Sequence, residues 1–224
     1  MKTHLHRDLE ELSENILAMG AQVESALELA SKALVGRRVK IAEQVLADDV
    51  EIDAKELKID DDCLKILALH QPVAGDLRQV TAAMKINNDL ERIGDLAVNM
   101  AERAIDLAGR EPINRELQFK QMTAAARWML RASLQALVTS DVSLAREVCA
   151  RDDEVDDINR LHFEMLIEHM GNHSDDVAVC LDYLTASLHL ERVADLATNI
   201  AQDVIFLVEA VDVRHGNDLR EQDG

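Results

Sequence analysis

The chain has 224 residues, 48% of them hydrophobic but only 2% aromatic, with eight glycines and two prolines. So few aromatic and turn-forming residues argue against a sheet-rich fold and favour an all-α protein of long packed helices, large enough to bury a core. A net charge of −19 argues against nucleic-acid binding and direct membrane insertion, because such a surface repels phosphate groups and anionic lipid headgroups.

The first residues, MKTHLHRDLEE, contain no apolar segment, and no apolar run of transmembrane length occurs anywhere. We therefore expect neither a signal peptide nor a membrane span. The three cysteines (Cys63, Cys149 and Cys180) lack metal or redox spacing, which is typical of structural thiols in a reducing compartment. The sequence predicts a cytoplasmic protein.

Helix-breaking residues predict six helices. The expected interruptions are Gly36–Arg38, His70–Pro72, Gly109–Asn114, Thr139–Asp141 and Gly171–Ser174. Pro72 suits the first turn of the third helix, where its missing N–H has no cost, and Ser174 suits the N-cap of the sixth.

The six helices form two similar sets of three. The third and sixth helices carry apolar ladders with steps of four and three residues, and each member of the second lies one hundred residues after its counterpart. The first and second helices repeat with an offset of 103. We expect a duplicated three-helix unit, residues 1–112 and 113–212, folded as two antiparallel bundles, with a disordered polar tail at 213–224.

One phrase of this repeat has diverged little. LERIGDLAVNMAE, residues 90–102, returns as LERVADLATNIAQ, residues 190–202, whereas the residues before each copy differ almost throughout. Within each copy an acid, an aspartate and an asparagine are spaced four apart and share one helix face. These residues are Glu91, Asp95 and Asn99, and Glu191, Asp195 and Asn199.

The second and fifth helices carry matching acid pairs, Asp49 with Asp53 and Asp152 with Asp156. If each hairpin turns at its expected interruption, these pairs lie level with the acids of the repeated phrase, roughly 30 Å from the turn at 1.5 Å per residue. Asp53 falls between Val50 and Leu57 at the spacing of a buried seam, where an unpaired acid is costly.

Four carboxylates at one level repel unless they are protonated, paired with arginine or bridged by cations. Oxygen ligands favour Mg, Ca, Mn or Fe. We therefore expect a metal site on each hairpin, and the alternative remains two solvated acidic faces with Arg92 and Arg192 as partners.

The doubled LERxxDxxxN phrase, the acid pairs DVEID and DDEVD, and the turn HQPVAGDLR at 70–78 resemble the PhoU family of bacterial phosphate-signalling proteins. The resemblance covers nearly the whole chain. Two features depart from it: Ala194 replaces the usual glycine, and NHSDDVA lacks the QP and DLR elements of the first half.

This resemblance implies a cytoplasmic regulator without catalytic activity, built from two bundles related by a pseudo-twofold axis. It implies a homodimer that connects the ATPase of the phosphate ABC transporter to the sensor histidine kinase and represses the kinase output when phosphate is plentiful. It also implies divalent or multinuclear metal, Fe, Zn, Mn or Mg. The implied ligands are Asp49, Asp53, Glu91, Asp95, Asp152, Asp156, Glu191 and Asp195, with Asn99 and Asn199 beside them.

Two other functions remain open. A metal-independent helical adaptor would use the acid stripes to dock basic partner surfaces. A carboxylate-bridged metal enzyme is disfavoured because no Glu-x-x-His pair, phosphate loop or nucleophile motif is present. His162, His189 and Trp128 are expected to serve packing or the surface.

Overall fold

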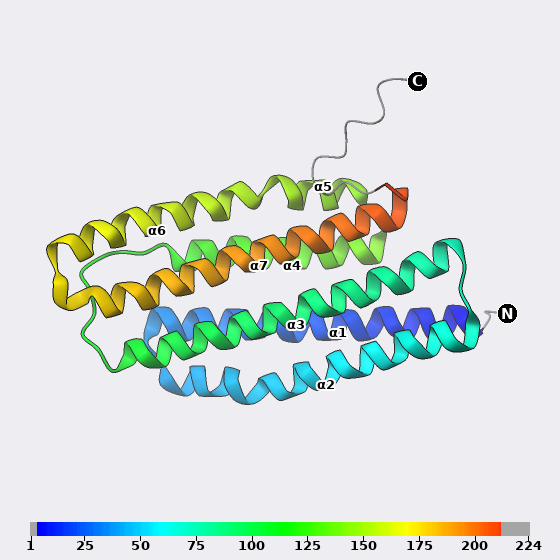
Figure 1. The fold of residues 1–224 in the computed structure, drawn as a ribbon, viewed down its shortest axis with the longest axis horizontal. Helices are drawn as coiled ribbons and strands as arrows, with labels where there is room; N and C mark the ends of the chain where they lie inside the picture. Colours follow the sequence, from blue (N-terminus) through cyan, green and yellow to red (C-terminus); the bar gives the residue numbers. More distant parts are fainter. Residues whose placement is uncertain (1–3, 212–224) are drawn as a thin grey trace, which may run out of the picture.

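The computed structural model describes residues 4–211, and every regular element in that range is helical (Figure 1). The all-α prediction with two three-helix bundles is confirmed. The first bundle contains α1 (His4–Gly36), α2 (Val39–His70) and α3 (Ala74–Ala108). The second contains α4 (Phe119–Thr139), α5 (Val142–Ala150), α6 (Asp152–Asn172), the 3₁₀ turn η1 (Ser174–Asp176) and α7 (Val177–Glu209).

The expected fifth helix is divided at Arg151 into α5 and α6, which the sequence did not predict. Arg151 has φ −95° and ψ −3°, and its guanidinium carbon lies 3.9 Å from the centroid of the half-buried Trp128 ring. Three acids, Asp152, Asp153 and Glu154, then open α6. Acids in a first turn stabilise a helix start through the helix dipole, so a new helix begins here.

Two predicted helix starts are wrong in detail. Pro72 precedes α3, whose N-cap is Val73, because Gln71 adopts a left-handed conformation that turns the chain between α2 and α3. Ser174 does not cap α7; it opens the 3₁₀ turn, and α7 follows from Asp176. The predicted tail, residues 213–224, lies outside the described residues.

The two bundles share one hydrophobic core. The predicted apolar ladder of α3 is fully buried, with Leu90, Ile93 and Met100 at 0% exposure. Its equivalents Leu190 and Val193 on α7 are also fully buried. α3 packs against α7 and α1 against α4, so the halves meet along two helix pairs. α2 and α6 lie at opposite edges of the molecule (Figure 1).

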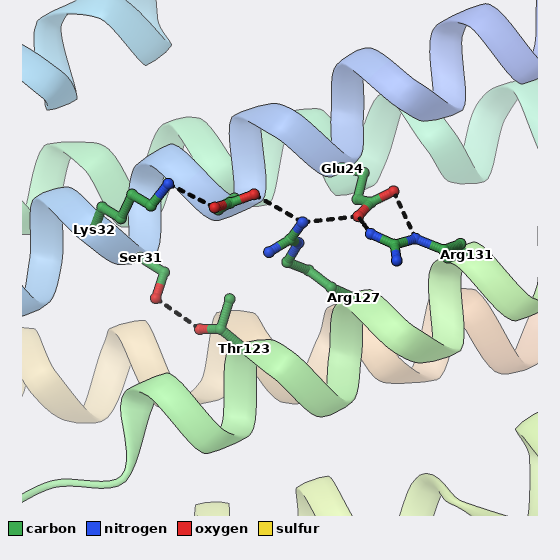
Figure 2. A network of polar contacts seen from close by, with 7 residues as sticks. Glu24, Ser31, Lys32, Thr123, Arg127 and Arg131 are labelled. Atoms are coloured by element: carbon green, nitrogen blue, oxygen red, sulfur yellow. Dashed lines mark hydrogen bonds and ion pairs between the residues drawn. The ribbon is translucent and has the colours of Figure 1, made fainter.

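Opposite charges join the two halves between α1 and α4 (Figure 2). Glu24 forms ion pairs with Arg127, at 2.8 Å, and with Arg131, while Arg127 also pairs with Glu28 at 2.8 Å. Burial alone raises the pKa of Glu24, but hydrogen bonds donated by Arg131 and Arg127 outweigh it and hold that pKa below its usual range. With the offset of 103, Glu24 is equivalent to Arg127 and Glu28 to Arg131. Each half therefore carries the charge that its counterpart needs.

The α3–α7 contact follows the same rule. The Lys85 ammonium pairs with the buried Asp203 carboxylate at 2.9 Å, and Arg103 pairs with the buried Asp182 at 3.4 Å. Arg103 and Asp203 are equivalent positions of the repeat. The halves have thus diverged in charge where they touch. In residues 4–211, no helix is long and apolar enough to cross a membrane.

Candidate functional site

The α2/α3 hairpin brings together the first set of predicted carboxylates. Burial raises the pKa of Asp49, and the negative charges of Asp53 and Asp95 add to the effect. Burial also raises the pKa of Glu91, with further contributions from Asp95, Glu56 and Asp53. We call Asp49, Asp53, Glu91 and Asp95 the first carboxylate cluster. The four acids are therefore near enough to one another for their charges to interact.

A glycine allows the two helices of this hairpin to approach closely. A Cβ atom on Gly94 would lie 3.3 Å from Ile52 Cγ2 and 3.7 Å from Asp49 Oδ1. The first distance is tighter than an ordinary contact, so Ile52 would have to shift. In the second half Ala194 occupies the equivalent position and is fully buried, which shows that the α6/α7 hairpin accommodates the extra methyl group.

The α6/α7 hairpin holds the second carboxylate cluster, Asp152, Asp156, Glu191 and Asp195. Burial raises the pKa of Asp152 to about 6, and Asp195, Asp156 and Asp153 add to it, while Thr198 acts weakly in the opposite direction. Burial followed by the charge of Asp156 also raises the pKa of Asp195. Both clusters thus contain acids whose pKa is raised by burial and by neighbouring carboxylates.

The second cluster differs from the first in its backbone setting. Asp152 is the first residue of α6, whereas its counterpart Asp49 lies within the continuous α2. The Oδ1 atom of Asp152 is buried and has no hydrogen-bond partner among residues 4–211. A buried, unpaired carboxylate oxygen beside three other acids is a suitable cation ligand.

The asparagines of the repeated phrase lie along the α3–α7 seam. A groove of about 330 Å³ is lined by equivalent residues from both helices. Its lining consists of Arg92, Asp95, Leu96 and Asn99 from α3, and Arg192, Asp195, Leu196 and Asn199 from α7. The two copies of the phrase therefore face each other across the axis that relates the halves, which the hairpin argument from sequence did not anticipate.

The prediction that Asp53 lies on a buried seam between Val50 and Leu57 is wrong. Val50 is 70% exposed and Leu57 67% exposed, and Asp53 is exposed as well. α2 instead buries another stripe, which includes Ile52 and Ile59, against α1 and α3. Asp53 is therefore in contact with solvent, and the first cluster opens to solvent on this side.

The donor chemistry of both clusters fits a hard cation, because every candidate ligand is a carboxylate or an amide oxygen. Among residues 4–211, however, no group of three or more His, Cys, Asp or Glu side chains is arranged as a metal-holding group. The residues thus fit a hard cation in chemical type, but their side chains are not gathered around one point. The metal assignment stays a prediction.

Sequence reasoning missed the buried acids between the halves. Burial and the nearby Asp203 raise the pKa of Asp89 to about 6, although Arg92 and Lys85 act in the opposite direction. The repeat offered no signal for Asp89, because its equivalent in the second half is His189. Such charges become visible only once α3 and α7 are packed together.

The expectation that His162 serves packing is confirmed. Its ring is fully buried, accepts a 2.8 Å hydrogen bond from the Gln118 backbone N–H and contacts Ser187 at 3.0 Å. Burial lowers the pKa of His162 to about 4. It is therefore a neutral structural side chain that anchors the start of α4 to α6 and α7.

With this geometry established, comparison with known proteins places the chain. The sequence profile described as "PhoU domain" matches twice, over residues 16–104 and 119–204. The chain belongs to the PhoU family. The two matches coincide with the two three-helix bundles, so each bundle is one PhoU domain.

Curated PhoU relatives match over nearly their whole length. A phosphate-specific transport system accessory protein PhoU homolog of Aquifex aeolicus is 35% identical over 211 residues, which cover 94% of this chain and 96% of the relative. The homolog of Pseudomonas aeruginosa is 36% identical over 210 residues, 93% of this chain and 86% of the relative. These proteins are named for accessory roles and not for a reaction, which confirms the prediction of a non-enzymatic family.

Two solved PhoU structures have the same fold. PhoU from Pseudomonas aeruginosa superposes with a TM-score of 0.90 at 33% identity and covers 93% of this chain and 100% of that one. The phosphate transport system regulatory protein PhoU from Streptococcus pneumoniae gives a TM-score of 0.87 at 28% identity, with 94% and 99% covered. The paired arrangement of PhoU domains is thus shared.

Proposed function

We propose that this protein is a cytoplasmic negative regulator of the phosphate-starvation response. In this role it links the ATPase of the phosphate ABC transporter to the sensor histidine kinase and keeps the kinase output low when phosphate is plentiful. Support comes from relatives named as accessory or regulatory proteins of phosphate transport, which this chain matches over more than nine-tenths of its length. A homodimer is part of the same proposal.

We further propose that each carboxylate cluster binds divalent or multinuclear metal. One observation carries this proposal: two hairpins hold equivalent sets of four carboxylates, each containing acids whose pKa is raised by burial and by the charge of the others. A bound cation would compensate these charges and fix the spacing of each helix pair. The ligands would be Asp49, Asp53, Glu91 and Asp95 in the first cluster, and Asp152, Asp156, Glu191 and Asp195 in the second.

The adaptor without metal remains the second candidate, and one observation favours it. Asp53 and Asp95 are exposed, so water alone could solvate these two charges. In that case the acid stripes would contact basic surfaces of a partner directly. The two candidates share the regulatory role and differ in whether metal is required.

Elemental analysis of the untagged protein separates these candidates. We expect bound metal in the wild-type protein, reduced by about half in Glu91→Ala/Asp95→Ala and in Glu191→Ala/Asp195→Ala, because each variant removes ligands from one cluster. Glu43→Ala/Glu164→Ala is the matched control, since both acids are exposed and lie outside the clusters. Metal that persists in both cluster variants would contradict the site, and a metal-free wild-type protein would favour the adaptor.

The regulatory role has its own test. In a strain lacking this protein, a reporter of the phosphate-starvation response should be active even in high phosphate, and the wild-type chain should silence it. If the metal proposal also holds, the two cluster variants should silence the reporter less well than the Glu43→Ala/Glu164→Ala control. A reporter that ignores the loss of the protein would contradict the regulatory role.

A further inference from the structure

The outer face of α2 carries a continuous apolar stripe that nothing in the described chain covers. Its large members are 70%, 67% and 57% exposed, and its small members are exposed alanines, with a single acid among them. We call this set the α2 stripe. It consists of Ala47, Val50, Ala54, Leu57, Asp61, Leu64 and Ala68.

The second half of the molecule serves as an internal control. At the offset of 103, the residues equivalent to Leu57 and Leu64 are Arg160 and Ile167. Four of the seven equivalents are charged, compared with one in the α2 stripe. These equivalents are Ala150, Asp153, Asp157, Arg160, Glu164, Ile167 and Gly171, and all are exposed. The PhoU domain therefore folds with a polar outer face, and its own packing does not require the apolar stripe of α2.

The spacing of the stripe fits another helix. Its members alternate steps of three and four from residue 47 to residue 68, roughly 32 Å of helix at 1.5 Å per residue. Larger residues alternate with smaller ones, so a partner helix can place its side chains over the alanines. Asp61 occupies the smaller position between Leu57 and Leu64. Binding of a β-strand or of a lipid surface would not require residues spaced alternately three and four apart.

The flanks of the stripe define the charge of the partner. Asp53 and Asp60 lie on the flank towards α3. Lys58 and Lys65 lie on the opposite flank, two turns after Glu51. Lys65 also forms an ion pair with Asp61 of the stripe. A complementary helix thus carries basic residues along one side of its apolar face and acidic residues along the other.

A second copy of this chain fits less well. In an antiparallel pair of α2 helices the flanks bearing Asp53 and Asp60 meet each other. In a parallel pair this acidic flank meets the lysine flank of the second copy, but Asp61 in the middle of the stripe meets its own equivalent. Carboxylates face carboxylates in both arrangements, so a different protein is the better occupant.

We infer that the α2 stripe is a docking surface for an amphipathic helix of a partner protein, with one basic and one acidic flank. This inference rests on the proposed function only for the biological role of the partner. It concerns α2 alone among the helices, and among these flank residues only Asp53 also belongs to the first carboxylate cluster. The molecule thus has a functional outer face on its first domain that the second domain lacks.

A synthetic helix of this chemistry tests the inference. The probe is a fluorescein-labelled amphipathic peptide of matching length, with leucine and alanine in the same three–four spacing, lysine along one flank and glutamate along the other. Fluorescence anisotropy should show binding to the full chain, and Leu57→Ser/Leu64→Ser should weaken it by about tenfold or more, because two apolar contacts are lost. A peptide with glutamate on both flanks should bind more weakly than the probe.

The matched control is Ile167→Ser/Leu181→Ser, which removes two apolar side chains of 52% and 51% exposure elsewhere on the surface. Its affinity for the probe should equal that of the wild type, and all proteins should melt at similar temperatures. Equal affinity of both double variants, or no binding by the wild type, would overturn the inference. A wild-type dimer in light scattering that becomes a monomer in Leu57→Ser/Leu64→Ser would replace the partner with a second copy. None of these outcomes depends on the reporter or on metal analysis.

Discussion

The α2/α3 and α6/α7 hairpins derive from one repeated unit and differ in an instructive way. Both keep a cluster of four carboxylates and both contribute one helix to the shared seam. They differ outside that region: α2 is continuous and apolar on its outer face, whereas its counterpart is divided at Arg151 and polar. The residues that stayed alike gather near the axis between the domains, and the residues that diverged point away from it or pair across it.

Features that both domains share and features that only one domain has suggest different roles. The carboxylate clusters belong to both domains and suit a function that each domain performs. The outer face of α2 belongs to one domain and suits an asymmetric contact with another protein. Charge divergence at the contact itself, as between Glu24 and Arg127, makes the two domains complementary and suits a fixed pair within one chain.

The largest expected effect tests whether the two domains share one core. Leu90→Ala and Leu190→Ala, both at fully buried positions, should each lower the free energy of unfolding by about 2–5 kcal/mol, because each leaves a cavity. Urea unfolding followed by circular dichroism should show one transition in each variant, because a single hydrophobic cluster spans both halves. Leu57→Ala, at an exposed position, is the control and should change stability by less than about 0.5 kcal/mol. Two transitions, with only one shifted, would show that the domains unfold independently.

A smaller effect tests the charge complementarity between the domains. Glu24→Arg places three arginines together and should lower the free energy of unfolding by about 1–2 kcal/mol at low salt, less in high salt. Glu24→Arg/Arg127→Glu restores opposite signs and should recover part of the loss. Calorimetric melting temperatures provide the measurement. A double variant no more stable than Glu24→Arg would mean that the local geometry, and not the sign of the charges, matters.

The smallest expected effect concerns how the free energy of unfolding depends on pH, and how the two carboxylate clusters differ in their contribution to it. The folded protein raises the pKa of Asp152 from 3.8 to about 6, so it binds this proton more tightly than the unfolded chain. The contribution of this group to stability should therefore fall as pH rises from 4 to 6, by about 1 kcal/mol after allowance for solvent screening. Asp152→Asn should remove this decline when metal is chelated.

Asp49→Asn is the comparison variant in the first cluster. Burial raises the pKa of Asp49 too, followed by the charges of Asp53 and Asp95. Its replacement by asparagine should therefore also reduce the fall in stability with rising pH. Urea unfolding across this pH range, in chelator, provides the measurement. An Asp152→Asn variant whose stability keeps the wild-type pH dependence would show that the carboxyl is not the group responsible.

Much of the architecture followed from local pattern. The helical ladders, the duplication and the level of the four carboxylates on each hairpin depend on the period of the α-helix and on the position of the turns, and both can be read from a single chain. The break at Arg151 could not be predicted in this way, because it accompanies the stacking of its guanidinium on Trp128, a residue of another helix. The buried pair of Lys85 and Asp203 likewise requires two domains to be packed together.

α2 shows where sequence alone stops. It carries two apolar series with the same seven-residue spacing, one through Ile52 and Ile59 and the other through Val50 and Leu57. The sequence determined that α2 is a helix and that acids lie between these series, because both facts depend on local spacing. Only the packing of α1 and α3 decided that the isoleucines enter the core and that the other series faces solvent, since burial depends on which neighbours arrive and not on the period of the helix.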